Sequence, residues 1–440
     1  MTVARFDKRR LQSRYVTEGV AAATSRTFMY GLGLGEADLH QPIVGVIAAY
    51  NGASPAGGAA LALIGAAERG VWAGGATPRA SATISDAGAS GHGHRSLLFR
   101  ELVADSAELT MRGHSYDAFV GLAASAASIA GLMMAMCRLD VPSALVALTG
   151  PELGSAPSTY AMAAVAEALG LAPPATASAG PGRGAAEAAA HAGGLATADR
   201  LAAGCSPRDL VTGEAVTRAA RVLTANDGDA ELLIHLVAIA HECGVALDLR
   251  HLAPDGGWVT GTLAPEGGLL TVRAGAVRRE LVAQVFDTER AACEWLRTAG
   301  WSAGTALVVR GQGPRGGPGM PRLDALTAAL TVCDLPPGAL LVTDGWAPSV
   351  PGLDRISAVA PEAADGGPLA ELAAGDALLL EPGAGTLDIV PAQDPERAPS
   401  APPPATTTAE RKYAQTVGPA RGGAVTHPGA AGERFRYGAL

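Results

Sequence analysis

Residues 118–148 read AFVGLAASAASIAGLMMAMCRLDVPSALVAL, and this stretch decides the fold of the first half of the chain. It begins with a short apolar run, Ala118–Leu122, and ends with another, Ala144–Leu148. Between the two runs, residues Ala130–Arg138 predict a helix. A strand, a helix and a second strand in this order form a right-handed crossover between parallel neighbours. We therefore expect a parallel sheet that is covered by helices.

The same alternation is present upstream of this unit. Residues Pro42–Ala49 (PIVGVIAA) predict a buried strand, and Ala56–Gly70 has the 3.6-residue apolar spacing of a helix. Residues Arg100–Arg112 predict a further helix. The pattern continues to about residue 252, so we expect residues 1–253 to form an α/β domain with a mostly parallel sheet.

The pattern of apolar residues changes after residue 254. Short β-branched runs broken by Gly and Pro follow one another, namely LLTVRAG, LVAQVFD, ALVVRGQG, ALLVTDG, DALLLEPGAG and LDIV. This spacing predicts a β-barrel-like domain over residues 254–392, with one or two inserted helices such as Thr288–Ala299. Residues 393–408, rich in Pro, Ala and Thr, predict a linker. Residues 409–440 are expected to pack back on the fold, with a short helix over Ala409–Val417.

Composition excludes several classes of protein. The 440 residues include 33 Lys and Arg against 42 Asp and Glu, a net charge of −9, so the basic excess of a nucleic-acid or anionic-membrane binder is missing. No run of about 18 apolar residues predicts a membrane span. The five cysteines are scattered singly, which argues against a disulfide framework or a zinc ribbon. These features favour a cytoplasmic protein that binds neither nucleic acid nor membrane.

Several longer segments resemble one known family. They include TISDAGASGHGH, RELVADSAELTMRGHSYDAFVGLA and GLMMAMCRLDVPSALVALTGPELG within residues 83–154, and later GTLAPEGGLLTV, GQGPRGGPGMP, VTDG, PEAADGGPLA and KYAQTVGPARGGAVTHP. The resemblance is to the dihydroxy-acid dehydratase and 6-phosphogluconate dehydratase family, iron–sulfur hydro-lyases that remove water from sugar acids and branched-chain dihydroxy acids. It implies an N-terminal α/β domain, a C-terminal β-barrel domain with the active site between them, and a homodimer, although this chain is shorter than typical members.

The cysteines that hold the cluster in this family have no counterpart here. By the resemblance, the first falls on Ala56 in YNGASPAG, the second on Ser125, and the third near Leu153 in the segment LGSAPSTY. Thiolate ligands are what binds iron and sulfide. Cys137 is the nearest cysteine in sequence, and its apolar neighbours predict a core thiol. We therefore predict no iron–sulfur cluster.

The magnesium site and the base of the family are also altered. Of the three implied magnesium ligands, Asp86 is retained, while Ala127 and Gln312 stand at the other two positions. A hard cation needs several oxygen ligands, so the resemblance implies a weakened site. The serine base of the family corresponds to a shortened turn in which Ser349 lies one position late. No cofactor is predicted, and bound magnesium or zinc stays open.

The segment DAGASGHGHR keeps three groups that suit either chemistry or metal binding. Asp86, His92 and His94 are compatible with an acid/base site near neutral pH, in which His94 contacts the substrate, or with a single metal ion. The structural alternative is that Asp86 caps a turn and His92 merely retains a family Gly-His pair.

Other candidates lie further along the chain. Glu231, with Asp227 and Asp229, occupies the place of a family loop, and is either a replacement acid/base group or a helix N-terminus. Arg315 in the loop GQGPRGGPGMP is a candidate anchor for a substrate carboxylate, next to Gln312. Glu266 in LAPEGG is a further candidate substrate contact, with a structural turn as the alternative.

These observations predict a divergent dehydratase-family protein. We expect a cluster-independent lyase or cyclase that acts by acid/base chemistry on a small hydroxylated or carboxylated metabolite, in specialised metabolism. Asp86, His92, Ser349 and Glu231 are its candidate catalytic residues. The first alternative is a noncatalytic protein that binds a small molecule or a partner subunit, and the second is a conventional dihydroxy-acid dehydratase.

Overall fold

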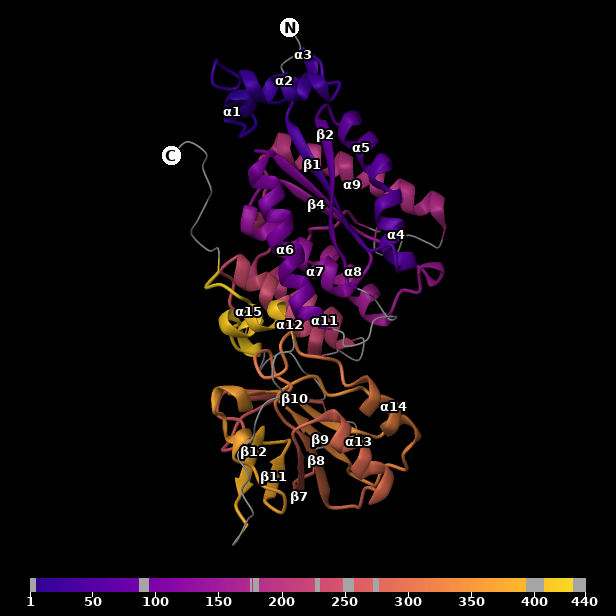
Figure 1. The fold of residues 1–440 in the computed structure, drawn as a ribbon, viewed down its shortest axis with the longest axis vertical. Coiled ribbons are helices and arrows are strands. Elements are labelled where there is room, and N and C mark those ends of the chain that lie inside the picture. The colour runs from indigo at the N-terminus through magenta and orange to yellow at the C-terminus, as the bar shows by residue number, and fades with distance from the viewer. Residues whose placement is uncertain are drawn as a thin grey trace.

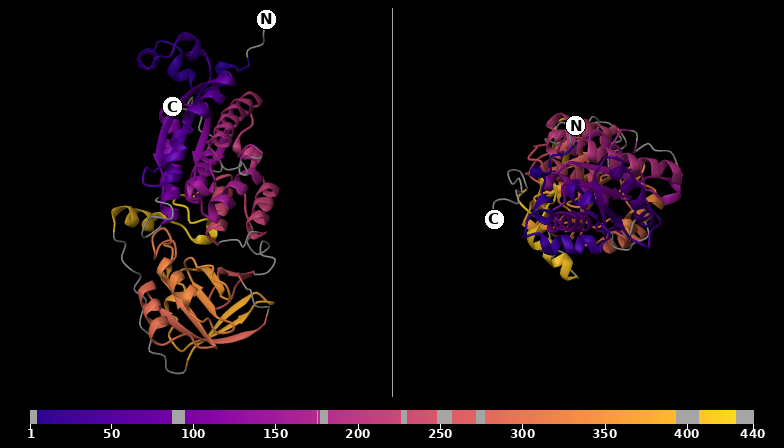
Figure 2. Two further views of the ribbon diagram at one scale, coloured as in Figure 1. Left: turned by 90° about the vertical axis from the view of Figure 1, so that its right-hand side faces the viewer. Right: turned by 90° about the horizontal axis from the view of Figure 1, so that it is seen from above.

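A computed structural model describes residues 5–86, 95–174, 176, 182–225, 230–247, 257–271, 277–392 and 407–429. Its two sheet-bearing halves are stacked along the long axis of the molecule, and the segment after residue 407 lies between them (Figure 1 and Figure 2). Among these described residues, no helix combines the length and the apolar character that a membrane crossing requires.

The N-terminal half is built on a four-stranded sheet in the order β2-β1-β3-β4, in which every neighbouring pair is parallel. Its strands are β1 (Ile43–Tyr50), β2 (Thr77–Ile84), β3 (Ala118–Ala123) and β4 (Ser143–Ala147). The predicted α/β fold with a parallel sheet is confirmed.

Helices cover both faces of this sheet (Figure 1). One face carries α4 (Pro55–Ala62), α5 (Ile64–Ala73) and α9 (Arg183–Ala203). The other carries α6 (Ser96–Gly113) and α7 (Ala126–Leu139), with α8 (Pro157–Ala168), α10 (Pro207–Leu210), α11 (Gly213–Ala225) and α12 (Ala230–Glu242) outside them. The chain enters through α1 (Arg14–Thr17), α2 (Ala23–Gly31) and α3 (Glu36–His40), which lie beyond the amino ends of the strands.

The single helix expected over Ala56–Gly70 is divided at Leu63. Ser54 caps α4, because its Oγ accepts a hydrogen bond from the Gly57 N–H at 3.4 Å, and Pro55 occupies the first turn. Leu63 ends α4 and precedes α5, and its side chain is buried. The break lets the second half turn its small residues toward α9, where a Cβ on Gly70 would lie only 2.0 Å from a carbonyl oxygen.

The C-terminal half is an eight-stranded mixed sheet in the order β12-β11-β7-β8-β9-β10-β6-β5. Its strands are β5 (Trp258–Val259), β6 (Gly267–Thr271), β7 (Arg279–Phe286), β8 (Thr305–Val309), β9 (Leu340–Thr343), β10 (Asp354–Ala360), β11 (Ala377–Glu381) and β12 (Thr386–Val390). A bridge between Thr260 and Thr386 brings the two edges of the sheet together. The predicted barrel-like domain is confirmed, with α13 (Glu289–Thr298) and α14 (Asp324–Val332) packed outside it.

The segment after residue 407 crosses back to the N-terminal half. Helix α15 (Thr408–Thr416) begins with a capping box, in which Thr407 and Glu410 satisfy each other's backbone N–H groups. Tyr413 and Val417 are buried in the core that also contains the side chains of α7 and α12. Further on, the carbonyls of Gly423 and Ala424 accept hydrogen bonds from Arg100 at 2.7 and 2.8 Å.

Candidate functional site

The two halves meet at the carboxyl edge of the parallel sheet. Arg95, just before α6, donates to the carbonyl of Pro318 at 2.7 Å and forms an ion pair with Glu410 at 2.6 Å. Met320 and Trp346 from the C-terminal half are buried in the same core as α6 and α7. The carboxyl ends of neighbouring parallel strands are where proteins of this class bind ligands, so the junction is the place to look for a site.

A chain of hydrogen-bonded hydroxyl groups runs along this edge. Ser125 Oγ donates to Ser128 Oγ at 2.9 Å, and Ser128 Oγ lies 2.9 Å from Ser85 Oγ. Ser85 in turn donates to Asp86 Oδ1 at 3.3 Å. Asp86 is buried, and the Asn51 side chain donates to its backbone carbonyl at 3.0 Å. The arrangement links a carboxylate to three hydroxyl groups that can pass a proton along one direction.

Local structure explains why these residues meet. Ser85 and Asp86 follow β2, while Ser125 follows β3 and caps α7 by accepting the Ser128 N–H at 3.3 Å. The spacing of three residues between Ser125 and Ser128 places both side chains on one face of the first turn. Because the strand ends share an edge, the serines of α7 reach the residues that follow β2.

The donor set at the three family cysteine positions does not fit an iron–sulfur cluster. Ala56 and Leu153 pack against one apolar cluster, which also contains Ala124, and Ser125 is engaged in the hydroxyl chain. The nearest thiol in sequence, Cys137, is fully buried near the end of α7. Its hydrogen bond with Cys243, together with burial, raises the pKa of the Cys137 thiol well above its usual range. It therefore stays a protonated core thiol.

The positions that match the magnesium ligands are mostly occupied by non-ligands. Ala127 is buried, and the amide nitrogen of Gln312 donates to the Arg310 carbonyl at 3.2 Å. Asp86 is the remaining carboxylate. Across the described ranges, no three His, Cys, Asp or Glu side chains are grouped so that they could hold a metal ion. His92 and His94 lie outside the described residues, so the metal alternative stays a hypothesis.

Glu231 lies at the start of α12 and is buried against the C-terminal half. Its Oε2 accepts a hydrogen bond from Arg322 at 3.2 Å, and its Oε1 lies 3.7 Å from His235 Nε2. Burial alone would raise the pKa of this carboxyl, but the imidazole of His235 and the charge of Arg322 outweigh it and hold the pKa well below its usual range. Glu231 is therefore an ionised hydrogen-bond acceptor that links the halves. Its predicted neighbours Asp227 and Asp229 lie outside the described residues.

The other predicted site residues are found around the barrel. The Arg315 guanidinium is held by Asp365 and by the Val417 carbonyl. Glu266 forms an ion pair with Arg421 at 2.7 Å. Ser349 is exposed in the turn after β9. In this structure, Arg315 and Glu266 thus connect the barrel to neighbouring segments, and the roles predicted for all three residues stay predictions.

The glycine-rich loop 311–321 is shaped by two buried carboxylates. Asp344 accepts backbone N–H groups from Gly311 at 3.0 Å and Gln312 at 2.8 Å. Glu362 accepts those of Arg315 at 3.0 Å and Gly316 at 2.9 Å. Burial raises the pKa of Glu362 to about 7, and the nearby charge of Asp344 acts in the same direction.

Glu362 makes the stability of the protein depend on pH. A folded-state pKa of about 7, against an ordinary value of 4.5, means that ionisation destabilises the fold as pH rises through this window. We expect the free energy of unfolding of Glu362→Gln, relative to wild type, to increase by about 3 kcal/mol between about pH 4.5 and pH 8. Urea denaturation at both pH values measures the difference.

The exposed Glu294→Gln is the matched control and should follow the wild-type profile. Parallel pH profiles for wild type and Glu362→Gln would contradict the assignment.

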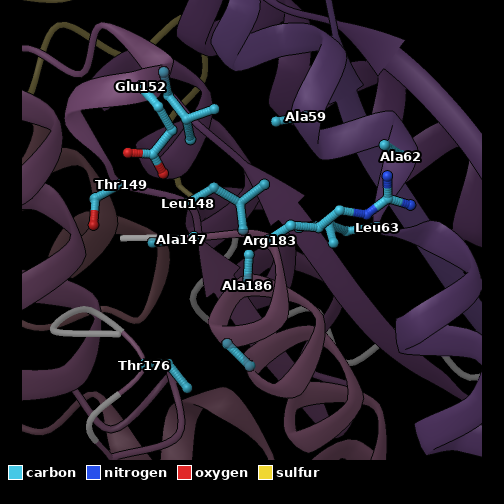
Figure 3. Close-up of a pocket in the computed structure, with 13 residues that line it drawn as sticks. Ala59, Ala62, Leu63, Ala147, Leu148, Thr149, Glu152, Thr176, Arg183 and Ala186 are labelled. Atoms are coloured by element: carbon cyan, nitrogen blue, oxygen red, sulfur yellow. The ribbon is translucent and has the colours of Figure 1, made fainter. Parts of the chain in front are cut away.

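A cavity of about 230 Å³ opens at the carboxyl end of β4. Alanine and leucine side chains from α4, α9 and the residues at and after the end of β4 form most of its wall. Figure 3 shows Glu152 and Thr149 on one side and Arg183 on the other. Leu153, near which the third cysteine position falls, is part of the lining, and Ala56 lies one helical turn before the lining residue Ala59.

Comparison with models of known protein families shows to which family the chain belongs. The model of the dihydroxy-acid/6-phosphogluconate dehydratase N-terminal domain matches residues 41–160 and 156–256, and that of the C-terminal domain matches residues 251–424. The chain belongs to the dihydroxy-acid/6-phosphogluconate dehydratase family. The resemblance that the sequence motifs indicated is thereby confirmed.

This dehydratase-family chain is similar to curated proteins along almost its whole length. It is 34% identical to dihydroxy-acid dehydratase 2 of Bradyrhizobium diazoefficiens, with 98% of each chain covered. It is 32% identical to the dihydroxy-acid dehydratase of Dinoroseobacter shibae, over 98% of this chain and 99% of that one. The first alignment runs over 564 residues against 440 in this chain, so the relative carries segments that are missing here.

Sequence reasoning did not predict the contact between Ser85 and Ser128 in this candidate site. Ser85 lies in the family-like segment TISDAGASGHGH and Ser128 in none of the quoted segments, and their contact depends on two strand ends coming together. Glu362 was also missed, although its segment PEAADGGPLA contributed to the resemblance. One sequence feature could have drawn attention to Glu362. It follows a proline and precedes a pair of glycines, and this pattern predicts a carboxylate at the start of a tight turn.

Proposed function

We propose that this protein is a cluster-independent lyase or cyclase of the dehydratase family. The observation that carries the proposal is the hydroxyl chain from Ser125 to Asp86, because Ser125 stands where the family places a cluster cysteine. A hydroxyl oxygen is a poor ligand for iron but a good relay for a proton. The serine hydroxyls thus offer a route for proton transfer at the position where the family has a cluster cysteine.

In an elimination, Asp86 receives the proton that leaves the substrate, directly or through the serines. An acid then protonates the departing hydroxyl group, so that a C–H and a C–O bond break, a C=C bond forms and water leaves. His92, six residues after Asp86 in the chain, is proposed as this acid, since an imidazole can give up a proton near neutral pH. The proposed substrate is a small hydroxylated or carboxylated metabolite, in keeping with the names of the relatives.

A noncatalytic role is the second candidate, and the cavity of about 230 Å³ is the observation that favours it. Most of its wall consists of alanine and leucine side chains, which bind apolar groups and offer no proton transfer. A conventional dihydroxy-acid dehydratase is the third. That activity would need thiolates at the positions of Ala56 and Ser125 and near Leu153.

The metal content of the protein tests this proposal. Protein purified without oxygen should be colourless, contain less than stoichiometric iron and sulfide, and fail to dehydrate 2,3-dihydroxy acids in the manner of the cluster enzymes, with or without magnesium. Stoichiometric iron and sulfide with a visible charge-transfer band would overturn the proposal. Stoichiometric zinc would instead assign His92 and His94 to a metal site.

A further inference from the structure

The cavity at the carboxyl end of β4 is a feature of the N-terminal half. Its lining residues in the described part of the chain all fall within residues 59–189, so none of them comes from the barrel. Leu63, Leu148 and Ala189 belong to the apolar core on the face of the sheet that α4 and α9 cover. Ser128 of the hydroxyl chain lies on α7, which covers the opposite face. The cavity is therefore separate from the proposed acid/base site.

The wall of the cavity is apolar because two helices present small side chains to it. Nine of the 13 lining residues are Ala, Leu or Gly. In Figure 3, the alanines of α4 lie above Leu148, and Ala186 of α9 lies below it. Protein interiors are normally filled by interdigitating side chains, and a methyl group fills less space than the larger aliphatic side chains do. The cavity thus follows from the alanine-rich sequences of α4 and α9.

The polar groups of the lining bond within the protein or lie at the mouth. The Thr176 hydroxyl donates to the Pro173 carbonyl at 2.6 Å. Arg183 Nε donates to Glu187 Oε1 at 2.8 Å, and the Arg183 side chain is 82% exposed. Glu152 is exposed as well. A molecule inside the cavity therefore meets mainly apolar side chains, and its outer end meets the charged residues.

The volume of the cavity sets the size of the molecule that fits. Protein interiors contain few voids larger than a water molecule, and 230 Å³ is far above that size. An apolar cavity of about 150 Å³ stays dry and binds benzene, which has six carbon atoms. In proportion, this cavity has room for about nine non-hydrogen atoms. Filling it is favourable, because a core loses stability in proportion to the volume left unfilled.

The charges at the mouth favour an uncharged outer end. Arg183 and Glu152 lie on opposite sides of the cavity and have opposite signs (Figure 3). The guanidinium of Arg183 is already paired with Glu187, so a ligand carboxylate would compete with that ion pair. A hydroxyl group can bond with water at the mouth and avoids the cost of partly burying a charge.

We propose that this cavity binds the aliphatic part of an uncharged small molecule, with about eight carbon atoms inside and a hydroxyl group at the mouth. Ala56 and Leu153, at or near two of the family's cysteine positions, pack against the same apolar core. Apolar side chains in place of thiols suit an aliphatic ligand. The proposal does not rest on the lyase reaction, because the cavity and the hydroxyl chain lie on different faces of the sheet.

Isothermal titration calorimetry of the full chain with straight-chain alcohols tests the proposal. From butanol to octanol, the association constant should rise about fourfold for each added CH₂ group, because each group is transferred from water to the apolar wall. Decanol should bind no more tightly than octanol, because the cavity is then full. An unbroken rise through decanol would indicate nonspecific adsorption and overturn the proposal. No binding of any alcohol, or tighter binding of octanoate or octylammonium than of octanol, would also overturn it.

A substitution that fills the cavity provides the second test. Ala186→Leu should lower the affinity for octanol by at least about 10-fold, because the larger side chain occupies space that the ligand needs. Leucine is a good helix former, so Tm should not fall. Ala59→Leu on α4 fills the cavity from the facing helix and serves if Ala186→Leu is unstable.

The matched control is Ala188→Leu, the same change at an exposed position of α9 outside the lining. It should bind octanol as wild type does. Wild-type affinity in both cavity-filling variants, or an equal loss in Ala188→Leu, would overturn the proposal. These outcomes are independent of the lyase reaction, which Asp86→Asn tests.

Discussion

Truncation after Thr408 is expected to destabilise the protein by at least about 3 to 6 kcal/mol, because it removes the buried side chains of Tyr413 and Val417 at about 1.5 to 3 kcal/mol each. It also removes the Gly423 and Ala424 carbonyls that accept hydrogen bonds from Arg100, a fully buried cation. Thermal unfolding and urea denaturation of the truncated chain measure the loss.

Point variants distinguish the contribution of helix α15 to stability from that of the rest of the segment. Tyr413→Ala should account for much of the loss, whereas Lys412→Ala, an exposed neighbour on α15, should leave Tm within a degree or two of wild type. Tyr413→Phe removes only a hydroxyl that lies 3.3 Å from the Ala424 carbonyl, so its effect should be small. An unchanged Tm in the truncated chain would show that the segment is dispensable.

The second large effect concerns Asp86. Once a substrate is found, Asp86→Asn should lower kcat/KM by about 100-fold to 10,000-fold, the usual contribution of one acid/base group. The amide can still accept the hydrogen bond from Ser85, so the fold should be retained, but it cannot take up the proton. Steady-state kinetics, with Tm as a check on folding, measures the effect.

Two comparisons define how this result is interpreted. Ser125→Ala breaks the relay and leaves the carboxylate, so it should produce a smaller loss than Asp86→Asn. The exposed Glu294→Gln should retain wild-type rates. Wild-type rates in Asp86→Asn would move the chemistry away from the hydroxyl chain, with Glu231 the next residue to replace.

Apolar periodicity predicted most of the buried strands. The runs that became β1, β3, β4, β7 and β8 are rich in large aliphatic residues, so their pattern is plain in the sequence. Strand β2 (TPRASATI) was missed because it lies at the sheet edge, where small and polar residues are tolerated. Strand β10 (DRISAVA) was missed because it buries the charged residues Asp354 and Arg355, and the ion pair of Asp354 with Arg279 is not visible in a single sequence.

Only part of the candidate site could be predicted from the sequence. Asp86 was proposed as a site residue because it lies in a segment that matches the family, and its catalytic role stays a prediction. Its serine neighbours were missed, because their contact joins residues 43 positions apart in the chain. Arg315 was predicted to bind a substrate carboxylate, and this role stays a prediction; in the structure its guanidinium contacts Asp365 and the Val417 carbonyl. The sequence shows only that an arginine is present. It does not show whether the arginine pairs with a carboxylate of the protein or with a ligand.

The return of the segment 407–429 also constrains how the protein is made. Arg100 meets its carbonyl acceptors 323 and 324 residues later in the chain, and Glu242 meets His427, which lies 185 residues after it. On the ribosome, the N-terminal half therefore emerges with Arg100 paired to Glu101 but without the two carbonyl acceptors of the C-terminal segment, which are added only after the barrel has been translated. The order of synthesis and the order of final folding differ, so the first half alone should be a client of chaperones rather than a finished domain.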